Sequence, residues 1–326
     1  MARKQDPVEI RLKILREERR EGDPDEIRKK VREALKDKHQ LVVALAAKFC
    51  EEYLFEDLEP DLIKAYNRFL ANPVKKDPNC RAKEAIVRAL AAINCQDVVF
   101  FIEGLKYRQL EPIWNDFTDT AVDVRVSCAM GLASASYPRA LVELAALLND
   151  PEDQARIGAV RAIAITQPLG AEALLRFKAL LGDPNPDVAS EALAGLLQLA
   201  PQDSKEFVHG FFQDDMDLVL RESLALSLGE SKTDEALEIL QELWENEPYK
   251  REQDLVLLRG AVLHRSEKAF DWLIDVISEG DRNIALFIIE ELSIYSANEQ
   301  LAAKIQSALA QFDDEELTSR FVQLWQ

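Results

Sequence analysis

The sequence contains few of the residues and motifs that catalysis and metal binding require. Its three histidines, His39, His209 and His264, are far apart, and its four cysteines form no CxxC pair. It also has no glycine-rich phosphate loop, no GxSxG turn, no HExxH helix and no EF-hand loop. We therefore expect no metal site, no cofactor and no recognised catalytic machinery.

Long apolar runs are also missing. No stretch approaches the roughly 18 uninterrupted apolar residues that a membrane-spanning helix needs. The first 22 residues, MARKQDPVEIRLKILREERREG, have positive charge but lack the apolar core of a signal peptide. The four cysteines are Cys50, Cys80, Cys95 and Cys128. We interpret them as small buried residues of a protein in a reducing compartment. We expect a cytoplasmic protein without a membrane partner.

Glycine is scarce, with 11 residues in 326, and Ala and Leu dominate the apolar set, which favours helices over strands. A phrase returns at intervals of about 30 residues: Asp150-Pro151 opens DPEDQARIGAVRAI, and Asp183-Pro184 opens DPNPDVASEALAGL 33 residues later. Similar phrases begin at Asp119 and Asp214, each 31 residues from its neighbour. This period predicts one supersecondary unit stacked on copies of itself.

We expect an all-α fold, a right-handed α–α superhelix of antiparallel helix pairs. The apolar spacing predicts one solenoid over 1–326, with a charged N-terminal cap over 1–38, helical repeats over 39–312 and a C-terminal cap helix over 313–326. Cys128, Ala159, Ala192 and Ser223 occupy equivalent positions in four inner helices, where large side chains would overpack the stack. The same register places Ser190 toward solvent.

These phrases resemble HEAT repeats, of the armadillo-like helical class. They are also similar to the HEAT-like repeats of phycobilin lyases and of many bacterial HEAT proteins. The family pattern has a turn Asp, followed five and six residues later by an aliphatic residue and an Arg. The resemblance implies a ladder of hydrogen bonds between turns, with Asp119–Arg125 and Asp150–Arg156 intact. Asp183 and Asp214 continue the series, but Ala189 and Leu220 replace the Arg, so we expect the ladder to lapse there.

The period is broken between Ala85 and Cys128, which are 43 residues apart, so about ten residues are inserted. Glu111-Pro112 ends a helix there, and a loop over 108–118 is predicted. Trp114, Asn115, Asp116 and Phe117 lie in this loop. Two interpretations remain open: the aromatic residues anchor a partner, or they pack over a gap left by irregular stacking.

Positive charge outside the N-terminus gathers mainly on the inner helices. A basic strip there would hold an anionic ligand or an acidic peptide, although the ladder already accounts for Arg125 and Arg156. The candidates for partner binding in this group are Arg81, Lys83, Arg88, Arg125 and Arg161.

The formal net charge of −19 is uneven, with +3 over 1–38 and −22 over 39–326. This charge disfavours nucleic acid, including DNA-lesion recognition, and favours basic or neutral partners, or it serves solubility alone. The leading hypothesis is a non-catalytic scaffold that binds a protein or peptide on its concave face. The alternative is a chromophore-handling protein similar to phycobilin lyases. The sequence leaves the partner's identity and the oligomeric state open.

Overall fold

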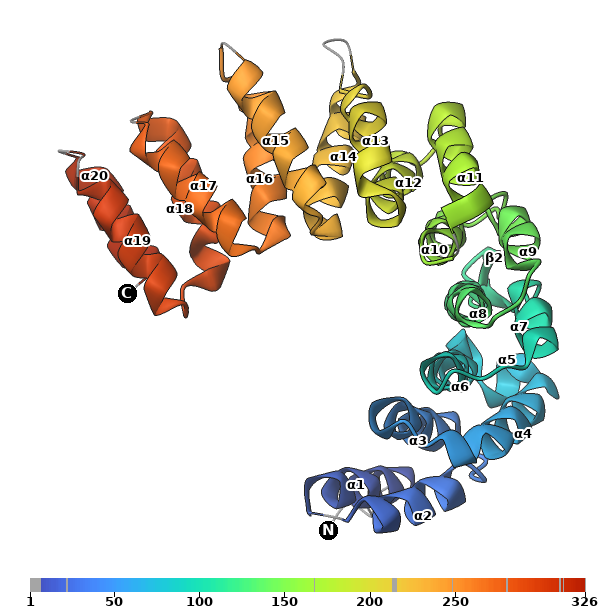
Figure 1. Ribbon diagram of the computed structural model, residues 1–326. Coiled ribbons are helices and arrows are strands. Elements are labelled where there is room, and N and C mark those ends of the chain that lie inside the picture. Colours follow the sequence, from blue (N-terminus) through green and yellow to red (C-terminus); the bar gives the residue numbers. More distant parts are fainter. Residues whose placement is uncertain are drawn as a thin grey trace. The chain divides into compact units, whose positions relative to one another are not determined.

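The computed structural model describes residues 7–325, apart from 22, 167, 213–215, 248, 280, 311 and 313. Over these residues the chain forms twenty α-helices and one two-stranded antiparallel sheet (Figure 1). Neighbouring helices pack on one another as repeats, so the fold is an all-α solenoid, as the sequence predicts. Among the described helices, none has the length and apolar character needed to cross a bilayer.

The chain forms two compact units, Met1–Gln167 and Pro168–Gln326. The first unit has an inner row in which α3, α6, α8 and α10 each pack on the next, with α4, α7 and α9 outside it (Figure 1). The elements of this unit are α1 (Pro7–Glu21), α2 (Pro24–Ala34), α3 (Gln40–Tyr53), α4 (Glu59–Leu70), α5 (Pro73–Lys76), α6 (Arg81–Ala92), α7 (Val98–Leu105), β1 (Leu110–Ile113), β2 (Asp116–Asp119), α8 (Val122–Ser134), α9 (Ala140–Leu147) and α10 (Asp153–Ala164).

The second unit repeats this arrangement without strands among its described residues. Its inner row is α12, α14, α16, α18 and α20, and α13 packs on α15 and α17 on α19 outside it. Its helices are α11 (Pro168–Leu181), α12 (Pro186–Leu199), α13 (Pro201–His209), α14 (Leu218–Ser231), α15 (Asp234–Asn246), α16 (Leu255–His264), α17 (Glu267–Ser278), α18 (Arg282–Leu292), α19 (Glu299–Leu309) and α20 (Glu315–Trp325). The sequence did not predict α13. The single solenoid over 1–326 stays a prediction.

Local chemistry explains where these helices begin. The side chains of Asp217, Thr233 and Ser266 each accept a hydrogen bond from a backbone N–H in the first turn of the helix that follows. Such N-caps satisfy donors that have no partner within the helix. The last helix, α20, is held by Phe321 and Trp325, which are buried against α18 and α19.

The small residues of the inner helices lie where the repeat register predicts them. Cys128, Ala159, Ala192 and Ser223 are all buried. The expectation for Ser190 is wrong, because its side chain is fully buried. The physical reason is that α12 packs against α11, α13 and α14, which leaves only a narrow strip of that helix open to solvent.

Candidate protein-interaction site

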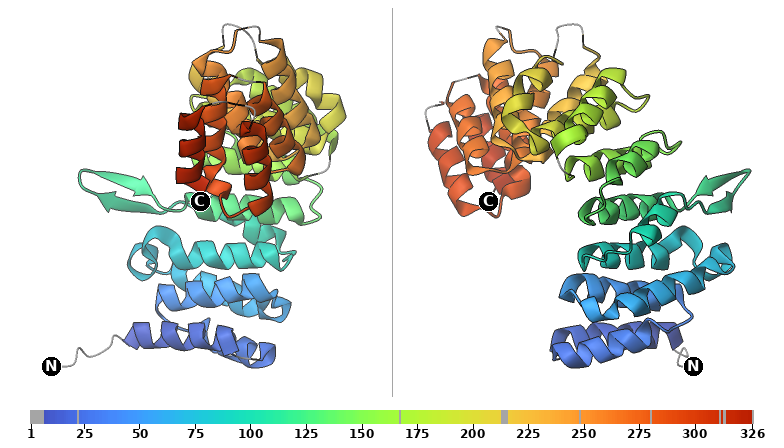
Figure 2. Two further views of the ribbon diagram at one scale, coloured as in Figure 1. Left: turned by 90° about the vertical axis from the view of Figure 1, so that its left-hand side faces the viewer. Right: turned by 45° about the vertical axis from the view of Figure 1, so that its right-hand side comes forward.

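The inserted segment between α7 and α8 forms a β-hairpin, where the sequence predicted a loop. β1 pairs with β2 from Leu110–Asp119 to Ile113–Asp116, and Trp114 and Asn115 make the turn. The two strands pair with each other, and the hairpin projects away from the helices of the first unit (Figure 2). The hairpin begins and ends in the connection between an outer helix, α7, and an inner helix, α8, and it does not lie on the face of the inner row (Figure 2).

The apolar side chains of this hairpin meet solvent. Trp114 is 98% exposed, Phe117 63%, Leu110 59% and Ile113 53%. Asn115 and Asp116, at the tip, are exposed as well. The interpretation that the aromatic residues cover a stacking gap is therefore wrong. In addition, α6 packs directly on α8 across the insertion.

The base of the hairpin, in contrast, is fixed by buried polar contacts. The side-chain amide of Gln109 donates to the Asp77 carbonyl (2.9 Å) and to Glu111 Oε1 (2.7 Å), and Gln109 is almost fully buried. Tyr107 donates its hydroxyl to Gln109 Oε1 (2.8 Å). Gln109 thus connects the hairpin to the turn that precedes α6.

Glu111 makes the second connection to that turn. Its Oε1 accepts from the Asn79 N–H (2.6 Å) and from the Thr120 hydroxyl (2.7 Å). Partial burial alone would raise the pKa of Glu111, but the hydrogen bonds from Thr120, Gln109 and Asn79 outweigh it, so the pKa lies below its usual value. A charged Glu111 therefore holds the base of β1 in place.

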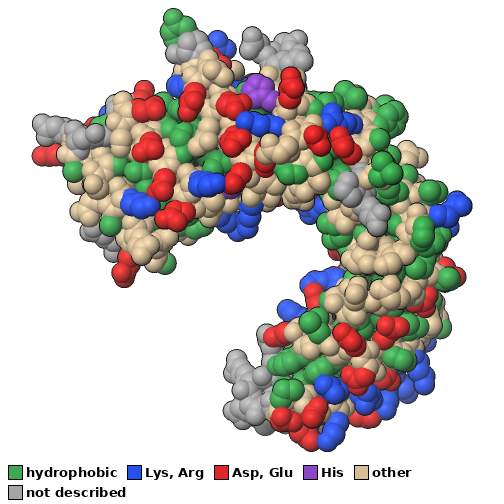
Figure 3. All heavy atoms as spheres, viewed as in Figure 1, with side chains coloured by type: hydrophobic (Ala, Val, Ile, Leu, Met, Phe, Trp, Pro, Cys, Tyr) green, Lys and Arg blue, Asp and Glu red, His purple; other side chains and the backbone are tan. Residues whose placement is uncertain are grey.

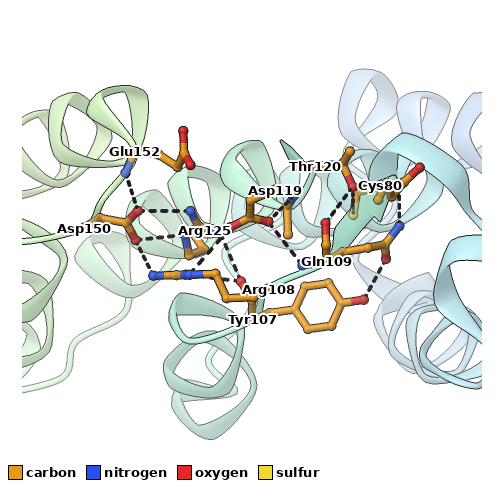
Figure 4. Close-up of polar contacts among 11 residues, drawn as sticks. Cys80, Tyr107, Arg108, Gln109, Asp119, Thr120, Arg125, Asp150 and Glu152 are labelled. Atoms are coloured by element: carbon orange, nitrogen blue, oxygen red, sulfur yellow. Dashed lines mark hydrogen bonds and ion pairs between the residues drawn. The ribbon is translucent and has the colours of Figure 1, made fainter. Parts of the chain in front are cut away.

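The other side of the hairpin base is held by a buried arginine (Figure 4). Arg125 Nη1 contacts Asp119 Oδ2 (2.7 Å) and donates to the Tyr107 carbonyl (3.1 Å), and Nη2 contacts Asp150 Oδ1 (3.1 Å). Arg108 adds a contact to Asp150 Oδ2 (2.6 Å). Burial raises the pKa of Asp119, but backbone donors and Arg125 outweigh it and lower the pKa. One guanidinium thus joins the turns before α8 and α10.

The remaining ladder residues that the structure describes make the following contacts. Arg156 donates to the backbone carbonyls of Asp150 and Pro151 (2.9 and 3.1 Å). Asp183 pairs with Lys178 (2.7 Å) and accepts from the Asn185 N–H. Asp214 lies outside the described residues.

Further rungs were not predicted from the sequence. Asp77 pairs with Lys83 (2.8 Å), and both side chains are fully buried. Their six-residue spacing equals that of Asp119 and Arg125, so the spacing could have revealed this rung. In the second unit, Arg221 reaches Asp254 of the following turn (2.9 Å), with no matching spacing in the sequence.

Two predicted partner-binding residues therefore need correction. Lys83 and Arg125 cannot touch a partner, because each is fully buried and paired with aspartate. Arg81, Arg88 and Arg161 are exposed, and Arg88 pairs with carboxylates of its own and the neighbouring helix. Only Arg81 lies in a segment that touches the hairpin base. The structure does not unite the predicted cations in one strip.

Similarity to known proteins supports the helical-repeat architecture of the second unit. No curated protein matches the chain. Residues 171–258, in the second unit, match a family model described as HEAT repeats. HEAT repeats are commonly protein-interaction scaffolds and are generally not catalytic. Residues 171–258 are thus similar to HEAT repeats, and the rows of paired helices agree with that architecture.

Proposed function

We propose that this chain is a non-catalytic scaffold that binds a protein or peptide, and that the β1–β2 hairpin is its principal contact. The observation that carries the proposal is the exposure of Trp114, 98%, at the tip of an element that is rigidly held at its base. Aromatic side chains dominate the binding energy of protein interfaces. Fixing the base before binding reduces the entropy that association costs.

The hairpin is otherwise difficult to explain. An isolated two-stranded hairpin is at best marginally stable in water, and this one leaves four large apolar side chains exposed. Burying apolar surface yields about 25 cal/mol per Å². A partner that covers the hairpin would gain this energy, whereas the folded chain alone does not.

The charge distribution supports a protein partner over nucleic acid. The second unit has 31 acidic and 13 basic residues, a net of −18, which would repel phosphates. The exposed side chains of Arg88 and Arg161 lie on helices of the inner row of the first unit, and this row is a further candidate contact surface. The chromophore-handling alternative stays a hypothesis, which the visible absorbance of a mixture with a bilin would test.

The proposal is tested by affinity capture from a lysate of the source cells with two purified variants. Trp114→Ala combined with Phe117→Ala should lose the captured partner and keep the melting temperature, because these side chains are mostly exposed to solvent. The matched control is Leu218→Ala combined with Tyr249→Ala, which removes exposed apolar groups from the second unit. Equal recovery with both double variants would reject the hairpin as the contact.

A further inference from the structure

We infer that the hairpin inserts tip-first into an apolar pocket of its partner protein, and that carboxylates border this pocket. The inference rests on the proposed function and adds a binding mode and the chemistry of the receiving surface. Three features of the first unit carry it: the blocked strand edges, the apolar residues on both hairpin faces, and the positive charge at the hairpin's foot.

The first feature disfavours strand addition, the usual way in which a hairpin binds an extended peptide. A peptide could add to either edge only through unpaired backbone groups. On β1, Pro112 has no N–H to donate. On β2, the Phe117 N–H is occupied by the Asp116 carboxylate (2.8 Å). Each edge therefore lacks one free backbone donor, which favours binding through side chains.

The second feature is the distribution of the apolar side chains. Residues opposite each other in the ladder share a face, so Leu110, Pro112 and Phe117 lie on one face and Ile113 lies on the other. Trp114 projects at the turn. A partner that docked on one face would leave apolar residues in water on the other. A pocket that encloses the tip covers both faces.

The third feature is local charge. Three segments adjoin the hairpin base: residues 73–81, whose turn at 77–80 contacts Gln109, Glu111 and Thr120, and residues 106–109 and 120–123, which lead into and out of the hairpin. Their exposed charges are Lys75, Lys76, Arg81, Lys106, Arg108 and Asp123; Arg108 is already paired with Asp150, and the hairpin tip itself adds the exposed carboxylate of Asp116. This positive foot stands in a chain whose formal charge is −19. Carboxylates around the pocket would complement it.

The test places the photo-crosslinking amino acid p-benzoylphenylalanine at position 114 of the full chain, in source-cell lysate. A matched probe at position 249 replaces another highly exposed aromatic residue in the second unit. We expect position 114 to crosslink to a protein segment in which apolar residues are flanked by Asp or Glu. A crosslink to nucleic acid, to a second copy of this chain or to a basic segment would overturn the inference, as would no crosslink.

Charge reversal then tests the foot. Lys75→Glu with Lys76→Glu should lower the crosslinking yield about tenfold, a typical loss for a charged rim that steers association. Lys38→Glu with Lys48→Glu makes the same charge change at exposed positions away from the hairpin and should leave the yield unchanged. Equal yields for both pairs would remove the carboxylate-bordered pocket.

Pro112→Val separates insertion from strand addition. This change restores the missing N–H on the β1 edge, so a partner that adds a strand should bind more tightly, whereas insertion predicts no gain. If the captured partner is lost with Trp114→Ala and Phe117→Ala but is insensitive to the charge reversal, or binds more tightly to Pro112→Val, the proposed function stands and this inference fails. If the wild-type chain recovers no partner, the proposed function itself fails.

Discussion

At the scale of single residues, the most consequential side chain is Arg125. It lies fully buried between Asp119 and Asp150. Breaking a buried ion pair by removing one partner costs more than the pair contributes, because the remaining charge stays buried without compensation. The Arg125 guanidinium joins the turns before α8 and α10. Its contacts therefore fix both the position of the hairpin base and the spacing of two consecutive repeats.

We therefore expect Arg125→Ala to lower the free energy of unfolding by roughly 3–5 kcal/mol, the usual effect of such a deletion. Arg88→Ala removes an exposed arginine paired with Glu51 and Glu84 and should cost about 1 kcal/mol or less. Urea unfolding of both variants compares the two directly. Similar midpoints would mean that Arg125 is not buried as described.

The carboxylates at the hairpin base predict a dependence on pH. Glu111 and Asp119 have folded-state pKa values below their ordinary values of 4.5 and 3.8. A lowered pKa stabilises the fold above the unfolded value, and this contribution is lost as the pH falls through the folded value. Below about pH 5 the wild type should lose its advantage over Glu111→Gln, which cannot titrate. Thermal melts from pH 7 to 3 measure this, and a constant difference would contradict it.

At the scale of elements, the repeats depend on close approach of helix backbones. A methyl group on Gly229, in α14, would overlap the carbonyl of Gly260 in α16, and one on Gly260 would come within 2.5 Å of the Ala225 carbonyl. A glycine at each of these positions therefore lets the two inner helices pack in contact. Neither glycine has a left-handed φ, so space and not backbone conformation requires it.

Gly229→Ala should therefore separate α14 from α16 and cost roughly 1–3 kcal/mol or more, as overpacking does. Gly210→Ala is the matched control, because an added methyl there meets nothing nearer than 3.4 Å. Differential scanning calorimetry should show a lower melting temperature for the first variant alone. A Gly229→Ala protein as stable as wild type would contradict the described packing.

The elements also show how far the sequence could be interpreted. The 31- to 33-residue period predicted the inner helices and their small buried residues, because that period repeats one packing problem in each unit. The hairpin was missed because Pro112 argues against a strand and the turn at Trp114–Asn115 lacks the usual glycine. The exposure of Trp114 could not be predicted, since it depends on α6 packing on α8. Ser190 was misplaced for a related reason: contacts from three helices override the period of one.

At the scale of the whole molecule, charge separates the two units. The first unit has 27 basic and 28 acidic residues, a net of −1, and the second has a net of −18. Figure 3 shows Asp and Glu side chains along the second unit, with Lys and Arg among them. Several of these cations join successive repeats, as Lys205 does with Glu238 and Glu242 and Lys304 with Asp271. The second unit has 18 more carboxylates than Lys and Arg side chains, so these ion pairs cannot neutralise all of its negative charge.

Salt should therefore stabilise the second unit. Raising sodium chloride from about 10 to 300 mM shortens the Debye length from about 30 Å to below 8 Å and screens the repulsion among like charges. Tryptophan fluorescence isolates this unit, because Trp244 and Trp325 are buried there while Trp114 is already exposed. We expect the fluorescence melting temperature to rise with salt. A fall would mean that the ion pairs between repeats outweigh the net repulsion.

The direct packing of α6 on α8 has an evolutionary consequence. Because the helices meet beneath the inserted residues, the hairpin is an addition to a connection that would close without it. Such an addition can be lost, lengthened or exchanged between related chains while the rows of helices persist. If the hairpin is the partner contact that we propose, a change in this one short segment could alter the choice of partner without changing the helical framework.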